Sequence, residues 1–232
     1  MKLHQLMGVD PASRVVALVG GGGKTTSLYA LAREARDGGR RSVLLTTTHI
    51  GRPKERDVRV FDTLDQEGME QAWEQGQVVA VGRYLPDGRL GQPEQAVWDY
   101  VFQRGQALYI EADGSRGLPL KYPADWEPVL PPETDQVLLL CGLSALDEPF
   151  DTYCHRAALA RQRLGIDQHL IDEALMARVL AAGYARFSPR AVINQADGPL
   201  LISRGQRLGQ ELARLGIEKC SVLSLHQLTG QN

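Results

Sequence analysis

The sequence is poor in cysteine and in long apolar runs, and each shortage excludes a class of protein. Its 232 residues include only three cysteines, Cys141, Cys154 and Cys220, which suits a reducing compartment better than a disulfide scaffold. No uncharged run approaches the roughly 20 residues that a membrane helix needs. The first residues, MKLHQLMGVDPASR, lack an apolar core of signal-peptide length. We therefore expect a cytoplasmic protein without a membrane partner.

An excess of positive charge is also lacking. Lysine and arginine number 26 against 28 acidic residues, for a formal net charge of −2, so no basic field would draw the chain to a nucleic acid. Hydrophobic residues make up 43% of the chain, enough to fill a sizeable core. Residues 1–232 are therefore expected to form one domain that binds small molecules or proteins.

Short runs rich in valine, leucine and isoleucine predict buried strands, because their apolar residues are continuous rather than alternating. These runs cover residues 14–19, 42–47, 77–82, 107–112, 136–142, 190–194 and 220–225. Helices are predicted between them at 24–37, 66–75, 93–104, 167–182 and 199–215, with Asp167 capping the fourth. The alternation predicts an α/β fold, a mostly parallel β-sheet flanked by helices. Five prolines in 114–135 predict a surface loop.

A glycine-rich loop follows the first predicted strand. Gly20, Gly21, Gly22 and Gly23 precede Lys24, Thr25 and Thr26, which open the first long helix. This order is typical of a phosphate-binding loop, in which backbone amides meet phosphate at a helix N-terminus, the lysine reaches the terminal phosphates and the threonine hydroxyl holds Mg²⁺. The usual spacing would require glycine where Leu18 stands. The shorter form found here resembles the loop of the ATP-dependent Mur ligases and folylpolyglutamate synthetases.

Polar residues follow three other predicted strands, where ligands of parallel sheets bind. Glu111 and Asp113 have the period-2 spacing that puts both carboxylates on one side, and we interpret them as Mg²⁺ ligands that also orient an attacking water; a simple turn is the alternative. Thr47 and Thr48 follow SVLL and offer hydroxyls to phosphate or metal-bound water, although Thr46 suits a strand equally well.

The segment VINQAD carries Asn194 and Asp197 and resembles the guanine-reading Asn-Lys-x-Asp element of GTPases, with Gln195 where lysine is expected; a plain strand-to-turn junction is an equal alternative. Arg116, Lys121 and Arg156 are candidate contacts to phosphate or an acidic substrate, and His155 is their neighbour, although solvated surface charges are commoner. The tryptophans at 73, 98 and 126 are interpreted as packing residues.

Taken together, the motifs VGGGGKTT, LLTTTHI, IEADGSRGLPLKYPADWEPVLP, the His155–Arg156 pair and VINQAD resemble the YqeC-like family. The resemblance covers residues 14–197 and implies a P-loop NTPase-like fold. It also implies association with the maturation of selenium-dependent molybdenum hydroxylases, so that such a hydroxylase or its cofactor-maturation proteins would be partners. Carried onto this chain, the family pattern assigns phosphate and Mg²⁺ to Gly20, Gly23, Lys24 and Thr25, and includes Glu111, Asp113, Lys121 and Arg156 as motif positions.

The sequence leaves three functions open. The first is a Mg²⁺-dependent accessory protein that binds ATP or GTP and hydrolyses it slowly through Lys24, Glu111 and Asp113. The second is an ATP-dependent ligase or kinase acting on a small acceptor, as the loop spacing suggests. The third is a nucleotide-gated module that presents a cofactor or partner without useful turnover.

Overall fold

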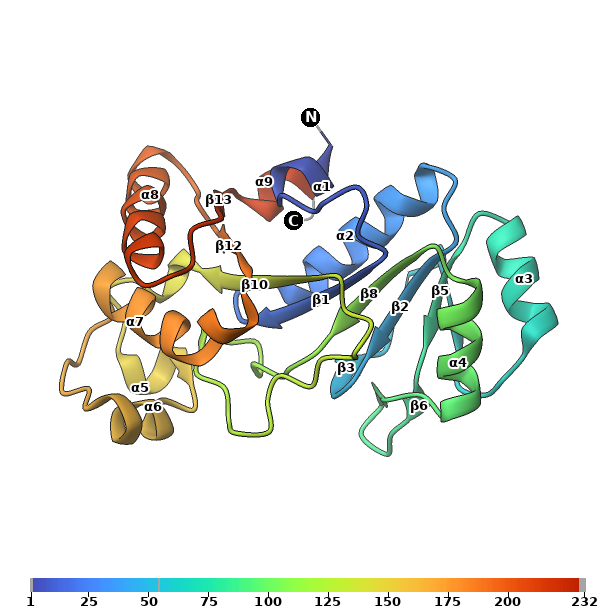
Figure 1. Ribbon diagram of the computed structural model, residues 1–232, viewed down its shortest axis with the longest axis horizontal. Helices are drawn as coiled ribbons and strands as arrows, with labels where there is room; N and C mark the ends of the chain where they lie inside the picture. Colours follow the sequence, from blue (N-terminus) through green and yellow to red (C-terminus); the bar gives the residue numbers. More distant parts are fainter. Residues whose placement is uncertain (1, 54, 230–232) are drawn as a thin grey trace.

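The computed structural model describes residues 2–53 and 55–229, and its centre is an eight-stranded sheet in which neighbouring strands run parallel (Figure 1). In spatial order the strands are β13 (Cys220–Val222), β12 (Arg190–Asn194), β10 (Gln136–Gly142), β1 (Val15–Gly20), β8 (Ala107–Glu111), β2 (Ser42–Thr46), β5 (Val78–Val81) and β4 (Val58–Phe61). The predicted α/β class is confirmed. Helices bury both faces of this sheet, which explains why its strands are apolar without alternation.

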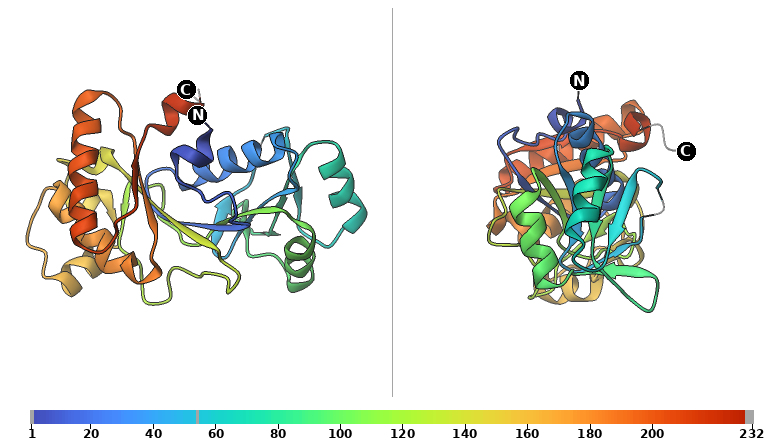
Figure 2. Two further views of the ribbon diagram at one scale, coloured as in Figure 1. Left: turned by 45° about the horizontal axis from the view of Figure 1, so that its top comes forward. Right: turned by 90° about the vertical axis from the view of Figure 1, so that its right-hand side faces the viewer.

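Helices cover both faces, as the two additional views show (Figure 2). On one face α2 (Lys24–Asp37) packs on alternate residues of β1, Val16 and Leu18, and the short α1 (Leu3–Leu6) and α9 (Leu225–Thr229) lie beside it. The other face carries α3 (Gln66–Glu74), α4 (Gln95–Arg104), α7 (Glu173–Tyr184) and α8 (Pro199–Arg214). No helix in the described part of the chain is long and apolar enough to cross a membrane.

The position of β1 determines where a ligand can bind. It lies between β8 and β10, with Leu18 paired to Glu111 on one side and Gly20 paired to Leu140 on the other. After β8 the chain crosses from one half of the sheet to the other, and ligands of parallel sheets bind at the carboxyl ends of the strands where such a reversal occurs. The glycine loop that follows β1 therefore occupies the expected ligand-binding position.

Two small sheets complete the fold. One is antiparallel and consists of β3 (His49–Gly51), β7 (Arg89–Gly91) and β6 (Arg83–Tyr84). The other is a parallel pair, β9 (Leu120–Lys121) with β11 (Cys154–His155). Two further helices, α5 (Phe150–Tyr153) and α6 (Ala157–Leu164), follow β10.

Three predictions about local structure were wrong. The buried strand predicted at 220–225 ends at Val222 and is only partly buried, and Leu225 already begins α9. Helix α7 begins at Glu173 rather than 167, because Asp172 and not Asp167 caps it by accepting a hydrogen bond from the Leu175 amide at 2.7 Å. The segment 114–135 is not a surface loop throughout. Leu120 and Lys121 are fully buried in β9, since the segment passes next to the glycine loop and packs against α7.

Candidate functional site

The glycine loop is anchored to neighbouring backbone on two sides. The Gly21 amide donates to the Leu140 carbonyl at 2.9 Å, and the Gly22 amide donates to the Leu118 carbonyl at 3.1 Å. Gly22 has φ +71°, and a Cβ there would lie 2.2 Å from the Gly142 nitrogen. Glycine is therefore required at this position both by conformation and by space.

The first turn of α2 exposes backbone donors. Gly23 is its N-cap, with φ 121° and no side-chain cap, and in the described part of the chain no acceptor faces the amides of residues 23–26. The same residues line a cavity of about 1000 Å³. Open amides at a helix N-terminus attract anions, through their partial positive charge and their unmet hydrogen bonds. Residues 23–26 thus offer unpartnered amides at a helix N-terminus, whereas the Gly20, Gly21 and Gly22 amides bond to the protein itself. Phosphate binding by this loop stays a prediction.

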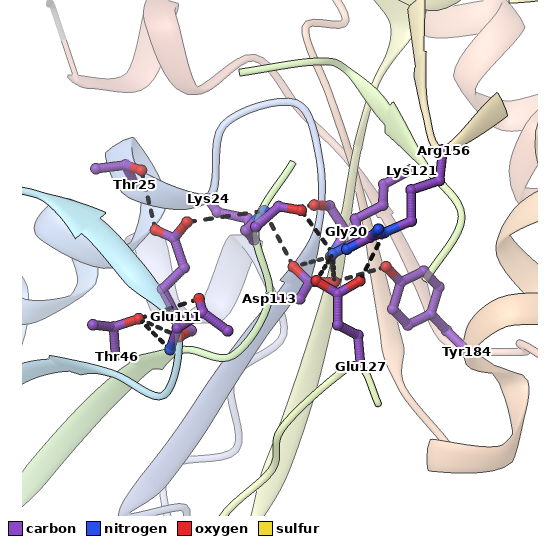
Figure 3. A network of polar contacts seen from close by, with 12 residues as sticks. Gly20, Lys24, Thr25, Thr46, Glu111, Asp113, Lys121, Glu127, Arg156 and Tyr184 are labelled. Atoms are coloured by element: carbon purple, nitrogen blue, oxygen red, sulfur yellow. Dashed lines mark hydrogen bonds and ion pairs between the residues drawn. The ribbon is translucent and has the colours of Figure 1, made fainter. Parts of the chain in front are cut away.

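Thr25 and Glu111 face each other beside Lys24 (Figure 3). The Thr25 hydroxyl donates to Glu111 Oε2 at 3.1 Å, and Lys24 Nζ lies 4.0 Å from Glu111 Oε1. All three residues line the cavity. Burial raises the pKa of Glu111, although Lys24 and Thr25 oppose this shift. A hydroxyl and a carboxylate next to open phosphate-binding amides are hard oxygen donors of the kind that Mg²⁺ prefers, so these two residues fit a Mg²⁺ ion.

Asp113 has a different position from the one predicted. Its side chain is fully buried, and both oxygens accept from the Gly20 amide at 3.1 Å. The Tyr184 hydroxyl donates to Oδ2 at 2.7 Å, and the Lys24 and Lys121 ammonium groups each lie 3.2 Å from a carboxylate oxygen. Asp113 does not line the cavity. The prediction of Asp113 as a Mg²⁺ ligand that orients water is therefore wrong, because its oxygens are already engaged in holding the loop.

The pKa values of this cluster reflect its burial. Burial alone would raise the pKa of Asp113, but the Lys24 and Lys121 charges outweigh it and hold that pKa below its usual value. Burial lowers the pKa of Lys121, against the pull of Asp113 and Glu127, and raises that of the Tyr184 phenol well above 10. No sequence motif points to Tyr184, which lies at the end of α7.

Lys121 also differs from its prediction. It is fully buried and joins Asp113 to Glu127, whose Oε1 lies 3.1 Å from Lys121 Nζ, and it donates to the Gly114 carbonyl at 2.7 Å. It does not line the cavity, so it cannot close over a phosphate as predicted. Arg156 Nε lies 3.1 Å from Glu127 Oε2. A chain of alternating charges thus runs from Lys24 to Arg156 (Figure 3).

The three threonines after β2 divide into structural and accessible residues. Thr46 is buried and donates to the Glu111 carbonyl at 2.9 Å, and it also accepts from the Thr48 amide at 3.0 Å. Thr47 and Thr48 line the cavity, where the Thr47 hydroxyl donates to the Val129 carbonyl at 2.8 Å. Thr46 is thus a strand residue, whereas Thr47 and Thr48 belong to the lining of the cavity.

Of the polar residues in VINQAD, Asn194 supports the glycine loop. Asn194 Nδ2 donates to the Gly22 carbonyl at 2.8 Å, and Asn194 Oδ1 accepts from the Leu225 amide at 2.9 Å. Asp197 accepts from the Ser224 hydroxyl at 2.5 Å, and Gln195 Oε1 from the Ser144 amide at 3.3 Å. None of the three motif residues lines the cavity. A role for Asn194 and Asp197 in reading a base stays a prediction.

The cavity extends from the glycine loop to the candidate anion contacts. Arg116, His155 and Arg156 all line it, together with residues of β3, β6 and β7. Trp126 also lines it and has 70% of its surface exposed. The prediction of Trp126 as a packing residue is therefore wrong, whereas Trp98 stacks on Phe102 with ring centroids 4.7 Å apart.

Comparisons with known proteins extend over most of the chain. The uncharacterized protein YqeC of Escherichia coli (strain K12) is 32% identical over an alignment of 150 residues, and the match covers 59% of this chain and 54% of that protein. The match thus spans about half the length of this relative. Among solved structures, the hydrogenase maturation factor HypB from Archaeoglobus fulgidus superposes with a TM-score of 0.43 and 11% identity, covering 97% of this chain and 86% of that one. The family model described as YqeC protein matches residues 16–158, a range that holds the glycine loop, the Thr25–Glu111 pair and Asp113 with its two lysine partners, and the chain belongs to the YqeC protein family.

Proposed function

We propose that the chain binds a nucleoside triphosphate at the N-terminus of α2 and hydrolyses it slowly. The observation that carries this proposal is the set of four unpartnered backbone amides at residues 23–26. The Lys24 side chain and the hydrogen-bonded side chains of Thr25 and Glu111 belong to the same site. The amides would hold the phosphate oxygens, and Lys24 would neutralise charge on the terminal phosphates.

Thr25 and Glu111 would hold a Mg²⁺ ion beside those phosphates. The metal would neutralise the negative charge of the phosphate oxygens. Both residues of this pair line the cavity, whereas Asp113 does not. The buried Asp113 holds Lys24 and Gly20 in place, so the loop would not need to be reorganised when phosphate arrives. Positioning and charge neutralisation supply most of the catalysis in phosphoryl transfer.

Calorimetric titration with ATP and with GTP, each with and without Mg²⁺, tests this proposal and identifies the base. We expect metal-dependent binding that the substitution Lys24→Ala weakens by about 1.5–3 kcal/mol, the value of a charged hydrogen bond. Lys219→Ala is the matched control, because Lys219 is exposed and lies outside the cavity. Equal affinity for the triphosphate in the wild type and Lys24→Ala would contradict the assignment.

A finer proposal is that the chain is an accessory protein in the maturation of selenium-dependent molybdenum hydroxylases. Its support is the resemblance of the EADGSRGLPLK and EPVLP motifs to the YqeC-like family. Affinity purification with a tagged molybdenum hydroxylase as bait tests it. We expect retention of the chain that depends on the triphosphate and is lost in Lys24→Ala. Retention of wild type and variant to the same extent, or of neither, would contradict nucleotide-dependent association.

A further inference from the structure

The cavity is larger than the glycine loop alone requires. Its volume of about 1000 Å³ lies at the upper end of the range for small-molecule sites. Residues 22–26 and Glu111 form one end of it, while the rest is lined by the small sheet β3–β7–β6 and by residues 114–117, 126–127, 129 and 155–156. Phosphates bound at the loop would occupy the inner end. The outer part is thus available to a second group.

Positive charge dominates the lining of this cavity. Five lysine or arginine side chains line it against two carboxylates, although the whole chain carries a net charge of −2. Glu111 and Glu127 are both engaged with neighbours. Arg83 and Arg116 are exposed, and neither has a carboxylate within 4.0 Å among the residues described. The uncompensated charge of the outer part therefore favours an anion.

Two of the arginines that line the cavity, Arg116 and Arg156, have an unfavourable backbone conformation. Arg116 has φ 54° and Arg156 has φ 66°, in the left-handed region that side chains with a Cβ rarely adopt. Such residues gather at ligand-binding sites, where the surrounding structure imposes the conformation. Both arginines line the same cavity, so the unfavourable conformations coincide with the accumulation of charge.

His155 lies where these positive charges converge. Burial, followed by the charges of Lys121 and Arg156 and, more weakly, that of Arg116, lowers its pKa to about 4. Its imidazole is therefore neutral near pH 7 and can donate one hydrogen bond without adding charge. The Arg156 guanidinium also lies 5.4 Å from the centre of the exposed Trp126 ring. A ligand that engaged Arg156 would consequently change the environment of an indole.

We infer that the outer part of the cavity is a second binding site, which takes an oxyanion carried by a small molecule that acts together with the nucleotide. The oxyanion is either a phosphate monoester or a carboxylate. Arg116 and Arg156 would hold the oxyanion from one wall, and Arg83 would approach from the other. Guanidinium groups suit both anions, because their planar fork can donate two parallel hydrogen bonds. The inference rests on the proposed function in that the nucleotide occupies only the inner end.

Trp126 fluorescence provides the assay. The protein is first saturated with Mg²⁺ and a non-hydrolysable triphosphate, and then titrated with inorganic phosphate in one arm and malonate in the other. We expect at least one of the two anions to bind saturably, and the tighter of the two identifies whether the site takes a phosphate or a carboxylate. The substitution Trp126→Phe should abolish the fluorescence change. Arg116→Ala and Arg83→Ala should each weaken binding about tenfold or more, through loss of a charge-assisted hydrogen bond. Arg214→Ala is the control, since Arg214 is 70% exposed and lies outside the cavity.

The inference is overturned if neither anion binds to the wild type at about 10 mM. It is also overturned if Arg116→Ala and Arg83→Ala both bind the anions with wild-type affinity. It is also overturned if Arg116→Ala weakens binding of the triphosphate but not of the second anion, because the arginine would then belong to the nucleotide site. If the wild type binds no triphosphate, the proposed function fails. The same titration of Lys24→Ala then tests the outer site by itself.

Discussion

Replacement of Asp113 by asparagine should destabilise the protein severely. The substitution removes a fully buried charge that lies 3.2 Å from both Lys24 Nζ and Lys121 Nζ. Removal of one partner from a buried ion pair costs about 3–5 kcal/mol. Lys121 would keep Glu127, and Lys24 would keep the Gly20 carbonyl at 2.5 Å, so we expect about 3 kcal/mol, the lower end of this range.

Urea unfolding followed by far-UV circular dichroism measures this loss, provided that the slope against denaturant is unchanged. For a chain of this length 3 kcal/mol corresponds to a fall in Tm of about 6–12 °C. Glu111→Gln is the matched control. Glu111 is almost as buried as Asp113, but burial raises its pKa, so folding already disfavours its charge and neutralising it should change stability by less than about 1 kcal/mol.

The two variants should also differ in their response to metal. Glu111→Gln should lose the Mg²⁺ dependence of triphosphate binding, because Glu111 faces the cavity beside Thr25, whereas Asp113→Asn should keep it. The reasoning is refuted if Asp113→Asn unfolds within about 1 kcal/mol of wild type or abolishes the metal dependence while Glu111→Gln retains it. In that case Asp113 would be the metal ligand.

Three further predictions follow from the same contacts. Thr25→Val should leave metal-free triphosphate binding unchanged and weaken binding with Mg²⁺ about tenfold in calorimetry, whereas equal weakening in both conditions would exclude a role in holding metal. Gly22→Ala should lower the free energy of unfolding much more than Gly39→Ala does. Both glycines have positive φ, but of the two only Gly22 has backbone atoms within 4 Å of the added Cβ. Equal losses in the two variants would contradict steric crowding at the loop. The folded pKa of His155 is about 4 against an ordinary 6.5; the unfolded chain therefore binds the extra proton between these values, and stability should fall as the pH drops from 6.5 to 4. His155→Gln should flatten that profile in urea titrations, and an unchanged slope would reject the shift.

Strands of the central sheet were predictable where apolar residues are continuous. The predicted strand at 136–142 and the predicted helix at 24–37 have the bounds found in the structure. Strand β4 was missed because its four residues include the charged Arg59 and give no continuous run. Helix α6 was missed because a helix of eight residues leaves too little periodicity to detect.

The candidate site was predicted only in part, because sequence motifs identify residue types but not what surrounds them. Lys24 and Thr25 lie where the loop motif placed them. Nothing in a proline-rich segment signals that Lys121 will be fully buried, since lysine is almost never buried unless it is paired, and its partners come from distant parts of the chain. Tyr184 is separated from Asp113 by 71 residues, and their contact depends on how α7 packs beside β9.

The loop at residues 20–23 is completed by chain synthesised much later. Its backbone amides donate to the carbonyls of Leu118 and Leu140. Asn194, which is 172 residues away in the sequence, donates to the Gly22 carbonyl. A ribosome adds about 5–20 residues per second, so Asn194 follows Gly22 by about 9–35 s. A nascent chain therefore spends most of its synthesis without the Asn194 contact that completes the glycine loop. The proposed nucleotide would therefore stabilise only chains in which Asn194 has reached the loop, and not shorter nascent chains.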